Sequence, residues 1–194
     1  MDQNNQKDNE DLFLIKEALE GNRDSFGLLV DKYKNSLFNL VYKYMGNSSD
    51  AQDICQDTFI KAYTHLNEYK INYKFSTWLF TIAANLSKNK LKRRKFIFFS
   101  IDKPIHTDEE NIIAEPEDKT SNNDTFMLKL EQAGLVTEML QSLPADYKIP
   151  FLLRHEENRS LEEIAQITNL SVGVVKIRIH RARMRLLKKY KEKL

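Results

Sequence analysis

Two consecutive helix start signals lie in residues 160–189, SLEEIAQITNLSVGVVKIRIHRARMRLLKK, and a tight turn separates them. Ser160 can cap the first helix, and Glu163 stands three residues later, where a capping box needs its carboxylate. Asn169 stands at the turn, since Asn tolerates the left-handed backbone that such turns often demand. Ser171 can cap the second helix. These residues predict a helix-turn-helix.

The second helix of this motif is basic around an apolar stripe. Val175, Ile179 and Ala182 recur at helical spacing and indicate the buried face, while Lys and Arg occupy the other faces. Such a helix can lie in the major groove of DNA, with its first turns at base edges and its cations on phosphates. A surface helix pair with a solvated basic face is the alternative interpretation. Cap, turn and pattern together favour DNA binding.

The rest of the chain is also predicted to be helical. The 194 residues can form one large or two small domains, and they include only 5 Gly and 4 Pro, which disfavours a turn-rich β fold. Apolar residues recur at helical spacing in residues 11–95 and again in residues 125–194, without the alternation of a strand. We therefore expect an all-α protein with two small helical domains.

The expected domain boundaries lie where this pattern stops. Residues 1–10 are polar and acidic, which predicts a disordered N-terminal tail before a first domain in residues 11–95. Residues 96–124 are predicted to be an acidic flexible linker, which includes the apolar residues 96–101 because a Pro and acidic residues follow them. The second domain, with the helix-turn-helix, then occupies residues 125–194.

Charge is distributed unevenly along the chain, although the net charge is only +2. Residues 88–95, KNKLKRRK, contain six basic residues and no acid, and residues 176–194 contain nine Lys or Arg and one Glu. Between them, residues 100–125 contain eight carboxylates and two Lys. Two basic segments on either side of an acidic one indicate two nucleic-acid contacts joined by a tether.

Several classes of protein are disfavoured by what the sequence lacks. Cys55 is the only cysteine, so no intramolecular disulfide can form and a reducing cytoplasm is the natural setting. It lies within an apolar helical pattern, which indicates a buried side chain. No apolar run approaches the ~20 residues of a membrane span, and no signal-peptide pattern is present. The four His are scattered, and no Gly-rich phosphate loop occurs. We expect a cytoplasmic protein with no membrane insertion, no metal, no cofactor and no catalytic residues.

The two ends of the chain together resemble the extracytoplasmic-function group of bacterial sigma-70 family factors. The first match is GNRDSFGLLVDKYKNSLFNLVYKYMGNSSDAQDICQDTFIKAY with FSTWLFTIAANLSKNKLKRR, and the second is LQSLPADYKIPFLLRHEENRSLEEIAQITNLSVGVVKIRIHRARMRL. Both stand in the family's order and spacing and cover most of the chain outside the tail and linker. Val174 and Ile177 depart from the Thr and Ser that members often carry. Both lie on the second helix, so they bear on promoter preference.

The resemblance implies an alternative sigma factor that binds core RNA polymerase and directs promoter recognition, DNA melting and transcription initiation. The implied partners are promoter DNA and the largest-subunit clamp and flap of the polymerase, and the family also admits an anti-sigma factor. The acidic linker resembles the segment that threads through the polymerase, and a passive tether explains it equally well. A stand-alone helix-turn-helix transcriptional regulator is the alternative function, which leaves the acidic helix and aromatic loop described next unexplained.

Carboxylates share one face of the helix predicted to begin after Ser49. Asp50, Asp53 and Asp57 recur at three- and four-residue spacing, and Gln56 lies beside them. By itself this pattern is typical of a solvated acidic face. The resemblance implies instead that the equivalent helix docks on a basic coiled coil of the clamp, where opposite charge fixes the register. The implied polymerase-binding residues are Asp50, Asp53, Gln56 and Asp57.

An aromatic loop precedes the basic run of residues 88–95. Trp78 and Leu79 are best explained as core, whereas the loop suits capture of an unstacked base beside cations that hold the strand. In similar sigma factors this region recognises and opens the −10 element, and we assign base capture to residues 72–76 without choosing among them. The implied −10 contacts are Asn72, Tyr73, Phe75, Ser76, Asn85, Lys88, Asn89, Lys92 and Arg93.

The basic second helix of the helix-turn-helix is the implied reader of the −35 element. Lys176 and Arg178 are expected near the base edges, and Arg183 and Arg185 nearer the backbone, with an exchange of roles between Arg178 and Arg181 as the open alternative. The implied −35 contacts are Ser171, Val172, Val174, Lys176, Ile177, Arg178, His180, Arg181 and Arg183.

Overall fold

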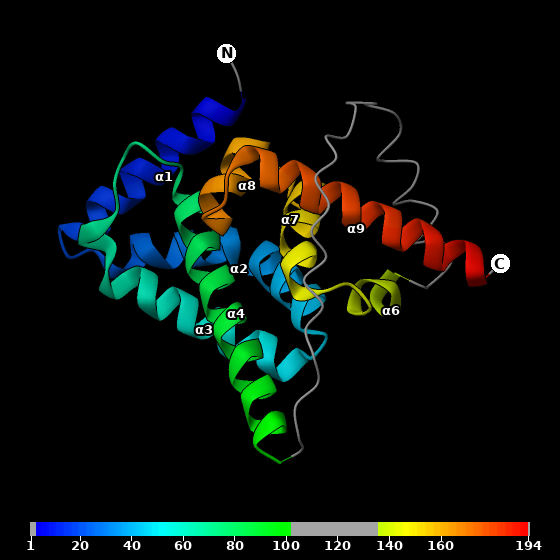
Figure 1. Cartoon of the computed structure of the whole chain (residues 1–194). Coiled ribbons are helices and arrows are strands. Elements are labelled where there is room, and N and C mark those ends of the chain that lie inside the picture. Colours follow the sequence, from blue (N-terminus) through cyan, green and yellow to red (C-terminus); the bar gives the residue numbers. More distant parts are fainter. Residues whose placement is uncertain (1–2, 102–135, 194) are drawn as a thin grey trace.

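The structure, a computed structural model, describes residues 3–101 and 136–193, and every regular element in those two ranges is a helix (Figure 1). This confirms the predicted all-α class. Most of the expected acidic linker, and the first part of the helical segment expected from Thr125, lie outside the described residues.

The N-terminal domain contains four α-helices and one short 3-10 helix. They are α1 (Gln3–Leu19), α2 (Arg23–Met45), α3 (Ser48–Thr64), η1 (Leu66–Glu68) and α4 (Phe75–Ile101). The side chains of Asn22 and Asn47 cap α2 and α3, and Gly46 ends α2 in the left-handed conformation with φ +72°. The cap of α3 is therefore Asn47 rather than the expected Ser49. Leu29, Phe75 and Leu79 are fully buried where these helices meet.

Helix α1 corrects the expectation of a disordered tail over residues 1–10, because it begins at Gln3. Acidic side chains of this segment pair with cations far along the chain. Lys32 lies 2.7 Å from Glu10 and 2.6 Å from Asp11, and Lys74 lies 3.7 Å from Asp8. These pairs hold α1 on the domain around residues 8–11, and no local pattern indicates them.

Helix α4 corrects the expected start of the linker, because it continues to Ile101. The basic run of residues 88–95 consists of good helix formers, and no Gly or Pro interrupts the helix before Pro104. The apolar residues 96–101 therefore extend the basic helix.

The C-terminal domain is built from α6 (Val136–Gln141), α7 (Ala145–His155), α8 (Leu161–Thr168) and α9 (Val172–Lys193). The stripe expected to be buried on α9 packs against α7 and α8, with Val175, Ala182 and Leu186 fully buried. Ile179 is partly buried on the same face.

The two domains pack together. Helix α8 lies beside the start of α4, and α6 and α7 pack against α2 (Figure 1). One apolar cluster joins the domains, with Tyr44 and Phe80 on one side and Met139, Phe151 and Ile164 on the other. This packing decides which of the predicted site residues are accessible.

Candidate functional site

The helix-turn-helix has the local geometry that its sequence predicts. The backbone N–H of Glu163 donates to Ser160 Oγ at 3.1 Å, and the N–H of Ser160 donates to Glu163 Oε2 at 2.9 Å, which completes the capping box. Asn169 adopts the left-handed conformation with φ +55°. The N–H of Val174 donates to Ser171 Oγ at 3.3 Å and begins α9. All three local expectations are confirmed.

The predicted −35 residues fall into two groups on α9. Ser171, Val174, Lys176 and His180 are exposed on its outer side. The rest are partly buried; these are Val172, Ile177, Arg178, Arg181 and Arg183.

Two of these arginines lie against α7 in the described structure. Arg178 Nη1 donates to the backbone carbonyl of Asp146 at 3.3 Å, and Arg181 Nη1 lies 3.5 Å from the hydroxyl of Tyr147. The guanidinium of Arg185 stacks 5.1 Å from the ring centre of Tyr147. Lys176 and His180 are therefore more exposed than Arg178.

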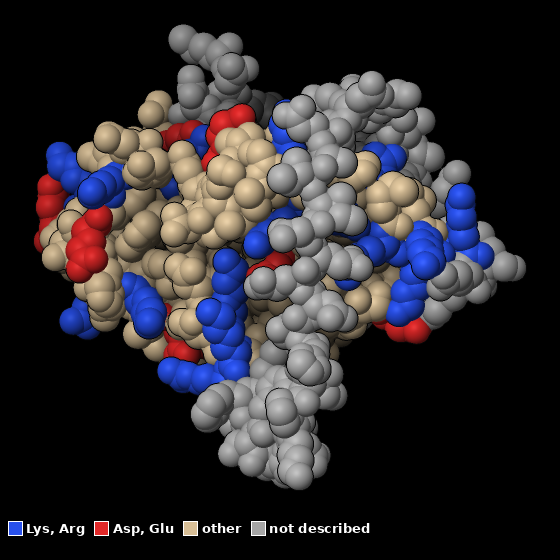
Figure 2. Space-filling view, viewed as in Figure 1, with Lys and Arg blue, Asp and Glu red and all other residues tan. Residues whose placement is uncertain are grey.

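Helix α4 presents a polar and basic stripe. Asn85, Asn89, Lys92 and Arg93 are exposed at helical spacing, whereas Lys88 is half-buried. Burial is the main cause of the lowered pKa of Lys88. The charge of Asp146 acts to raise this pKa, and the charges of Arg178 and Lys92 act to lower it. Figure 2 shows Lys and Arg gathered over α4 and over α9 on one face of the molecule. The stripe predicted as a DNA contact is thus exposed except at Lys88.

A cavity lies between the end of α3 and the first turns of α4. Its volume is about 260 Å³, and an indole ring, two amides and a Lys contribute to its wall. An aromatic surface beside amide donors and acceptors is suited to stacking and hydrogen bonding of one unpaired base. The lining residues are Lys61, His65, Glu68, Trp78, Ile82, Asn85, Leu86 and Asn89.

Only Asn85 and Asn89 of these eight residues are predicted from the sequence; the other six include Lys61, His65 and Trp78. Trp78 lies on the same helical face as Asn85 and Asn89, at seven- and eleven-residue spacing, so a helical projection of α4 could have found it. Lys61 and His65 belong to the end of α3, and only the packing of α3 on α4 brings them to the cavity.

Some side chains of the loop expected to capture a base are buried. Asn72 and Tyr73 are exposed, but Phe75 is buried in an aromatic cluster, with its ring centre 5.7 Å from Tyr33 and 5.8 Å from Trp78. Ser76 is buried as well, and its hydroxyl accepts a hydrogen bond from Arg159 at 2.8 Å. Phe75 therefore serves the core, which corrects its assignment to DNA contact.

The acidic face of α3 also contains both exposed and buried residues. Asp53, Gln56 and Asp57 are exposed, whereas Asp50 is buried and pairs with Arg94 and, at 2.9 Å, with Lys90. This placement corrects the assignment of Asp50 to a polymerase surface, since its carboxylate joins α3 to α4. Sequence spacing places all three aspartates on one face, but α4 covers only the edge that carries Asp50.

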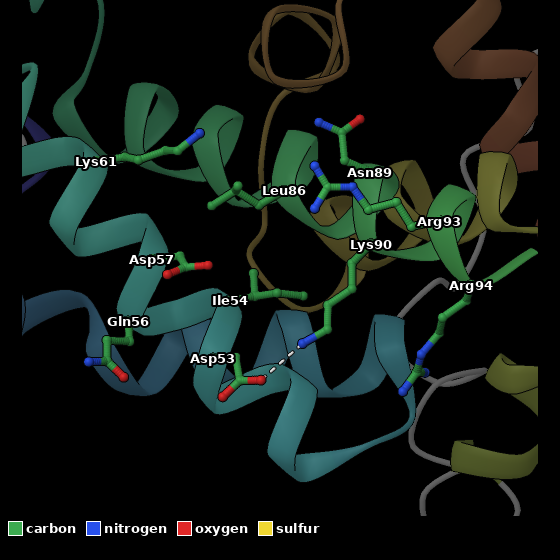
Figure 3. Close-up of a pocket in the computed structure, with 10 residues that line it drawn as sticks. All are labelled: Asp53, Ile54, Gln56, Asp57, Lys61, Leu86, Asn89, Lys90, Arg93 and Arg94. Atoms are coloured by element: carbon green, nitrogen blue, oxygen red, sulfur yellow. Dashed lines mark hydrogen bonds and ion pairs between the residues drawn. The ribbon is translucent and has the colours of Figure 1, made fainter. Parts of the chain in front are cut away.

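A groove separates the exposed acids of α3 from the cations of α4 (Figure 3). Lys90 spans the groove, with its ammonium 3.0 Å from Asp53. The pKa of Lys90 is raised, mainly by its hydrogen bond to Asp50. Asp57 and Arg93 line opposite walls of the same groove, whose volume is about 630 Å³. The acidic face is therefore bordered, and at Asp53 partly neutralised, by basic side chains.

The remaining chemistry of the described residues is sparse. Among residues 3–101 and 136–193, no three His, Cys, Asp or Glu side chains gather as metal ligands would. Burial raises the pKa of the Cys55 thiol to about 12, which disfavours its thiolate form at neutral pH. In the same part of the chain, no helix combines the length and the apolar character needed to cross a membrane.

Two family models match the chain, one in each domain. The model described as Sigma-70 region 2 matches residues 29–97, and the model described as Sigma-70, region 4 matches residues 133–186. The first match contains α3 with most of α4, and the second contains the helix-turn-helix.

Curated proteins match over nearly the whole length. The chain is 34% identical over 186 residues to the ECF RNA polymerase sigma factor SigW of Bacillus subtilis (strain 168), covering 92% of this chain and 95% of that protein. It is 35% identical over 179 residues to the ECF RNA polymerase sigma-E factor of Escherichia coli (strain K12), covering 89% and 90%.

Two solved structures share the fold. CnrH in complex with the cytosolic domain of CnrY aligns with a TM-score of 0.66 and 24% identity over 94% of this chain and 98% of that one. The sigma factor RpoE of Bartonella quintana, in complex with the anti-sigma factor NepR, aligns with a TM-score of 0.64 and 23% identity over 86% and 96%.

Proposed function

The chain belongs to the extracytoplasmic-function RNA polymerase sigma factors of the sigma-70 family, and we propose that its two domains divide promoter recognition between the −10 and −35 elements. As an alternative sigma factor it binds core RNA polymerase and directs transcription initiation. Members of this family are DNA-binding initiation factors, and phosphodiester synthesis belongs to the polymerase. We place its action in the cytoplasm, where the polymerase works.

The N-terminal domain is proposed to hold the −10 element on the exposed stripe of α4. Asn85 and Asn89 border the cavity, while Lys92 and Arg93 continue the same side of the helix. A base leaving the duplex could stack on Trp78 inside the cavity, with the cations on its phosphates. Asn72 and Tyr73 are exposed and stay candidates for contacts to the same strand.

The C-terminal domain is proposed to read the −35 element with the first turns of α9. Lys176 and His180 project outward and can approach base edges, and Val174 offers an apolar contact to a thymine methyl group. Arg183 and Arg185 lie farther along the helix, where phosphates would be reached.

The clamp of the polymerase is proposed to dock on three exposed polar residues of α3, Asp53, Gln56 and Asp57. Their charge suits a basic partner, and competition for Asp53 by Lys90 makes part of this surface depend on salt. The flap would contact the C-terminal domain. An anti-sigma factor stays a candidate partner on the family resemblance.

The observation that carries the −10 assignment is the exposed amide pair, Asn85 and Asn89, at the mouth of the cavity. We expect the double variant Asn85→Ala/Asn89→Ala to bind core polymerase normally and to melt a promoter at least about tenfold less, because the contacts of both amides are lost. Permanganate reactivity of the melted thymines measures this. The matched control is Asn35→Ala/Asn39→Ala, which removes two exposed amides from α2 at the same spacing.

Normal melting by the double variant would contradict the −10 assignment. Sequence-specific binding of a palindromic duplex by the chain alone, without any stimulation of polymerase, would instead support a stand-alone regulator.

A further inference from the structure

Three arginines share the side of α9 that faces α7. Arg178, Arg181 and Arg185 recur at three- and four-residue spacing, so they lie on one side of the helix, and α7 packs against α9. The first turn of α7 supplies a partner for each of them. Asp146 contacts Arg178, and Tyr147 contacts the other two arginines. The start of α7 therefore arranges part of the basic surface of α9.

Asp146 and Tyr147 act on their arginines in different ways. Arg178 Nη1 lies 3.3 Å from the carbonyl oxygen of Asp146 and 3.8 Å from its Oδ1, so a carboxylate stands beside this cation. The guanidinium of Arg185 instead lies 5.1 Å from the ring centre of Tyr147. A carboxylate cancels the charge of its partner, whereas an aromatic ring carries no net charge. Tyr147 therefore holds an arginine and leaves the charge of that arginine available to an anion.

The ring of Tyr147 is itself fixed by its surroundings. The backbone N–H of Tyr147 donates to the carbonyl of Pro144, the residue before α7, at 3.0 Å. The side chain is partly buried and packs against the apolar core of the domain. A Tyr side chain has two rotatable bonds, whereas an Arg side chain loses much more freedom when it is ordered. A fixed ring therefore reduces the entropy cost of holding Arg185 in one geometry.

The ring of Tyr147 contributes more to this arrangement than its hydroxyl does. Arg181 Nη1 lies 3.5 Å from the hydroxyl, which is at the long end of hydrogen-bond distances and makes a weak contact. Arg185 is exposed, so its guanidinium can meet a phosphate while its other side rests on the ring. Arg185 is thus the residue through which Tyr147 acts.

We propose that Tyr147 is a positioning residue for the −35 contact, and that its ring holds Arg185 in the geometry in which the guanidinium meets a DNA phosphate. Tyr147 acts on a phosphate contact, so it raises the affinity for all −35 sequences alike. The inference rests on the proposed function, because it assumes that α9 lies on promoter DNA. Ordering Arg185 before the DNA arrives lowers the cost of binding.

The test is a double-mutant cycle in the holoenzyme, formed from the full chain and core RNA polymerase. Its members are the parent protein, Tyr147→Leu, Arg185→Ala and the double variant Tyr147→Leu/Arg185→Ala. The probe is a duplex promoter fragment that the parent holoenzyme transcribes. Fluorescence anisotropy measures its binding in the cold, where the duplex stays closed, over a series of salt concentrations. Binding of each variant to core polymerase is measured separately.

The two single variants are expected to have unequal effects that do not combine. Arg185→Ala should weaken promoter binding about tenfold, since a charge-assisted phosphate contact is lost. Tyr147→Leu should weaken it about threefold, the scale of an exposed cation–π contact. The double variant should bind as Arg185→Ala does, because Tyr147 has no effect without its arginine. Independent roles would give about a thirtyfold loss in the double variant.

Salt dependence separates positioning from a merely structural role. The loss in Tyr147→Leu should be largest at low salt and should shrink as salt rises, because the contact to phosphate is screened. Partial unfolding would instead lower the affinity by the same factor at every salt concentration. Tyr147→Phe keeps the ring and should restore nearly all of the binding. Tyr147→Met lacks a ring and should match Tyr147→Leu, so the result does not depend on how well Leu packs.

The matched control is Tyr42→Leu in the N-terminal domain. Tyr42 is also partly buried against apolar side chains, and its ring stacks on Phe38 with the centres 6.0 Å apart. Its loss should leave both the affinity and the salt dependence of promoter binding unchanged.

Three results would overturn the role of Tyr147 and leave the proposed function intact. These are independent losses in the double variant, a loss in Tyr147→Leu that is the same at every salt concentration, and binding by Tyr147→Phe as weak as that of Tyr147→Leu. Unchanged binding by Arg185→Ala would overturn the phosphate contact of Arg185 and, with it, the positioning role. Unchanged promoter binding by the holoenzyme when the −35 element is scrambled would overturn the −35 function itself.

Discussion

Helices α4 and α9 are both long and basic, but their cations have different tasks. On α4, Lys90 and Arg94 turn toward acids of α3, and the polar stripe that includes Asn85 and Arg93 stays exposed. On α9, several arginines turn toward α7, and Lys176 stays on the outer side. Neighbouring helices therefore divide the cations of a basic helix into those that join helices and those that stay exposed.

The largest expected effect separates the buried face of α9 from its outer face. Leu186→Ala should lower the free energy of unfolding by about 3 kcal/mol, because Leu186 is fully buried and its removal leaves a cavity. Met184→Ala, on an exposed position two residues away, should cost less than about 0.5 kcal/mol. Urea unfolding followed by circular dichroism measures both. Equal losses would mean that the assigned faces of α9 are wrong.

The next effect distinguishes the joining cations of α4 from its exposed stripe. Asp50→Asn should destabilise the protein by about 2 kcal/mol, because Lys90 and Arg94 lose a buried carboxylate partner and both remain partly solvated. Asp57→Asn should leave stability nearly unchanged and weaken binding of core polymerase. Denaturant unfolding and a polymerase-binding titration test the pair of variants. If the Asp50→Asn protein is stable but binds polymerase weakly, Asp50 belongs to the polymerase-binding surface after all.

A smaller effect should distinguish the residues of α9 that contact base edges from those that contact phosphates. Lys176→Ala should change base preference at one −35 position by about 1–2 kcal/mol. Arg185→Ala should weaken all sequences alike and lower the salt slope of DNA binding by about one. A randomised −35 library, transcribed with each variant, measures the preferences. If Arg178→Ala shifts the preference and Lys176→Ala does not, Arg178 leaves Asp146 when DNA binds.

The smallest expected effect is a pH dependence at the α2 end, where Lys148 meets the N-terminal domain. Burial lowers the pKa of Lys148 from its ordinary 10.5 to about 8, so the folded protein releases this proton before the unfolded chain does. The free energy of unfolding should therefore rise with pH between about 8 and 10.5. The rise should stay within about 1 kcal/mol, because the ammonium also donates to Tyr44 and Gln141. Lys148→Met should abolish it in a series of denaturant titrations, whereas Lys34→Met should retain it.

The helix-turn-helix and the all-α class follow from the amino-acid sequence alone. A capping box, a left-handed Asn and an N-terminal Ser act within a few residues of one another, so their geometry follows from local chemistry. The apolar stripe of α9 follows from helical periodicity alone. The polar and basic stripe of α4 is implied by the family resemblance together with the basic run of residues 88–95, and the structure leaves all of it exposed except Lys88.

Contacts between helices that are distant in the sequence determine which of these groups face outward. Asp50 and Asp53 are three residues apart on one helix, yet α4 buries the first and leaves the second exposed. Phe75 enters an aromatic core, and Ser76 meets Arg159 from the other domain. Helix periodicity describes one helix at a time, whereas burial and ion pairing depend on neighbours that lie far along the chain.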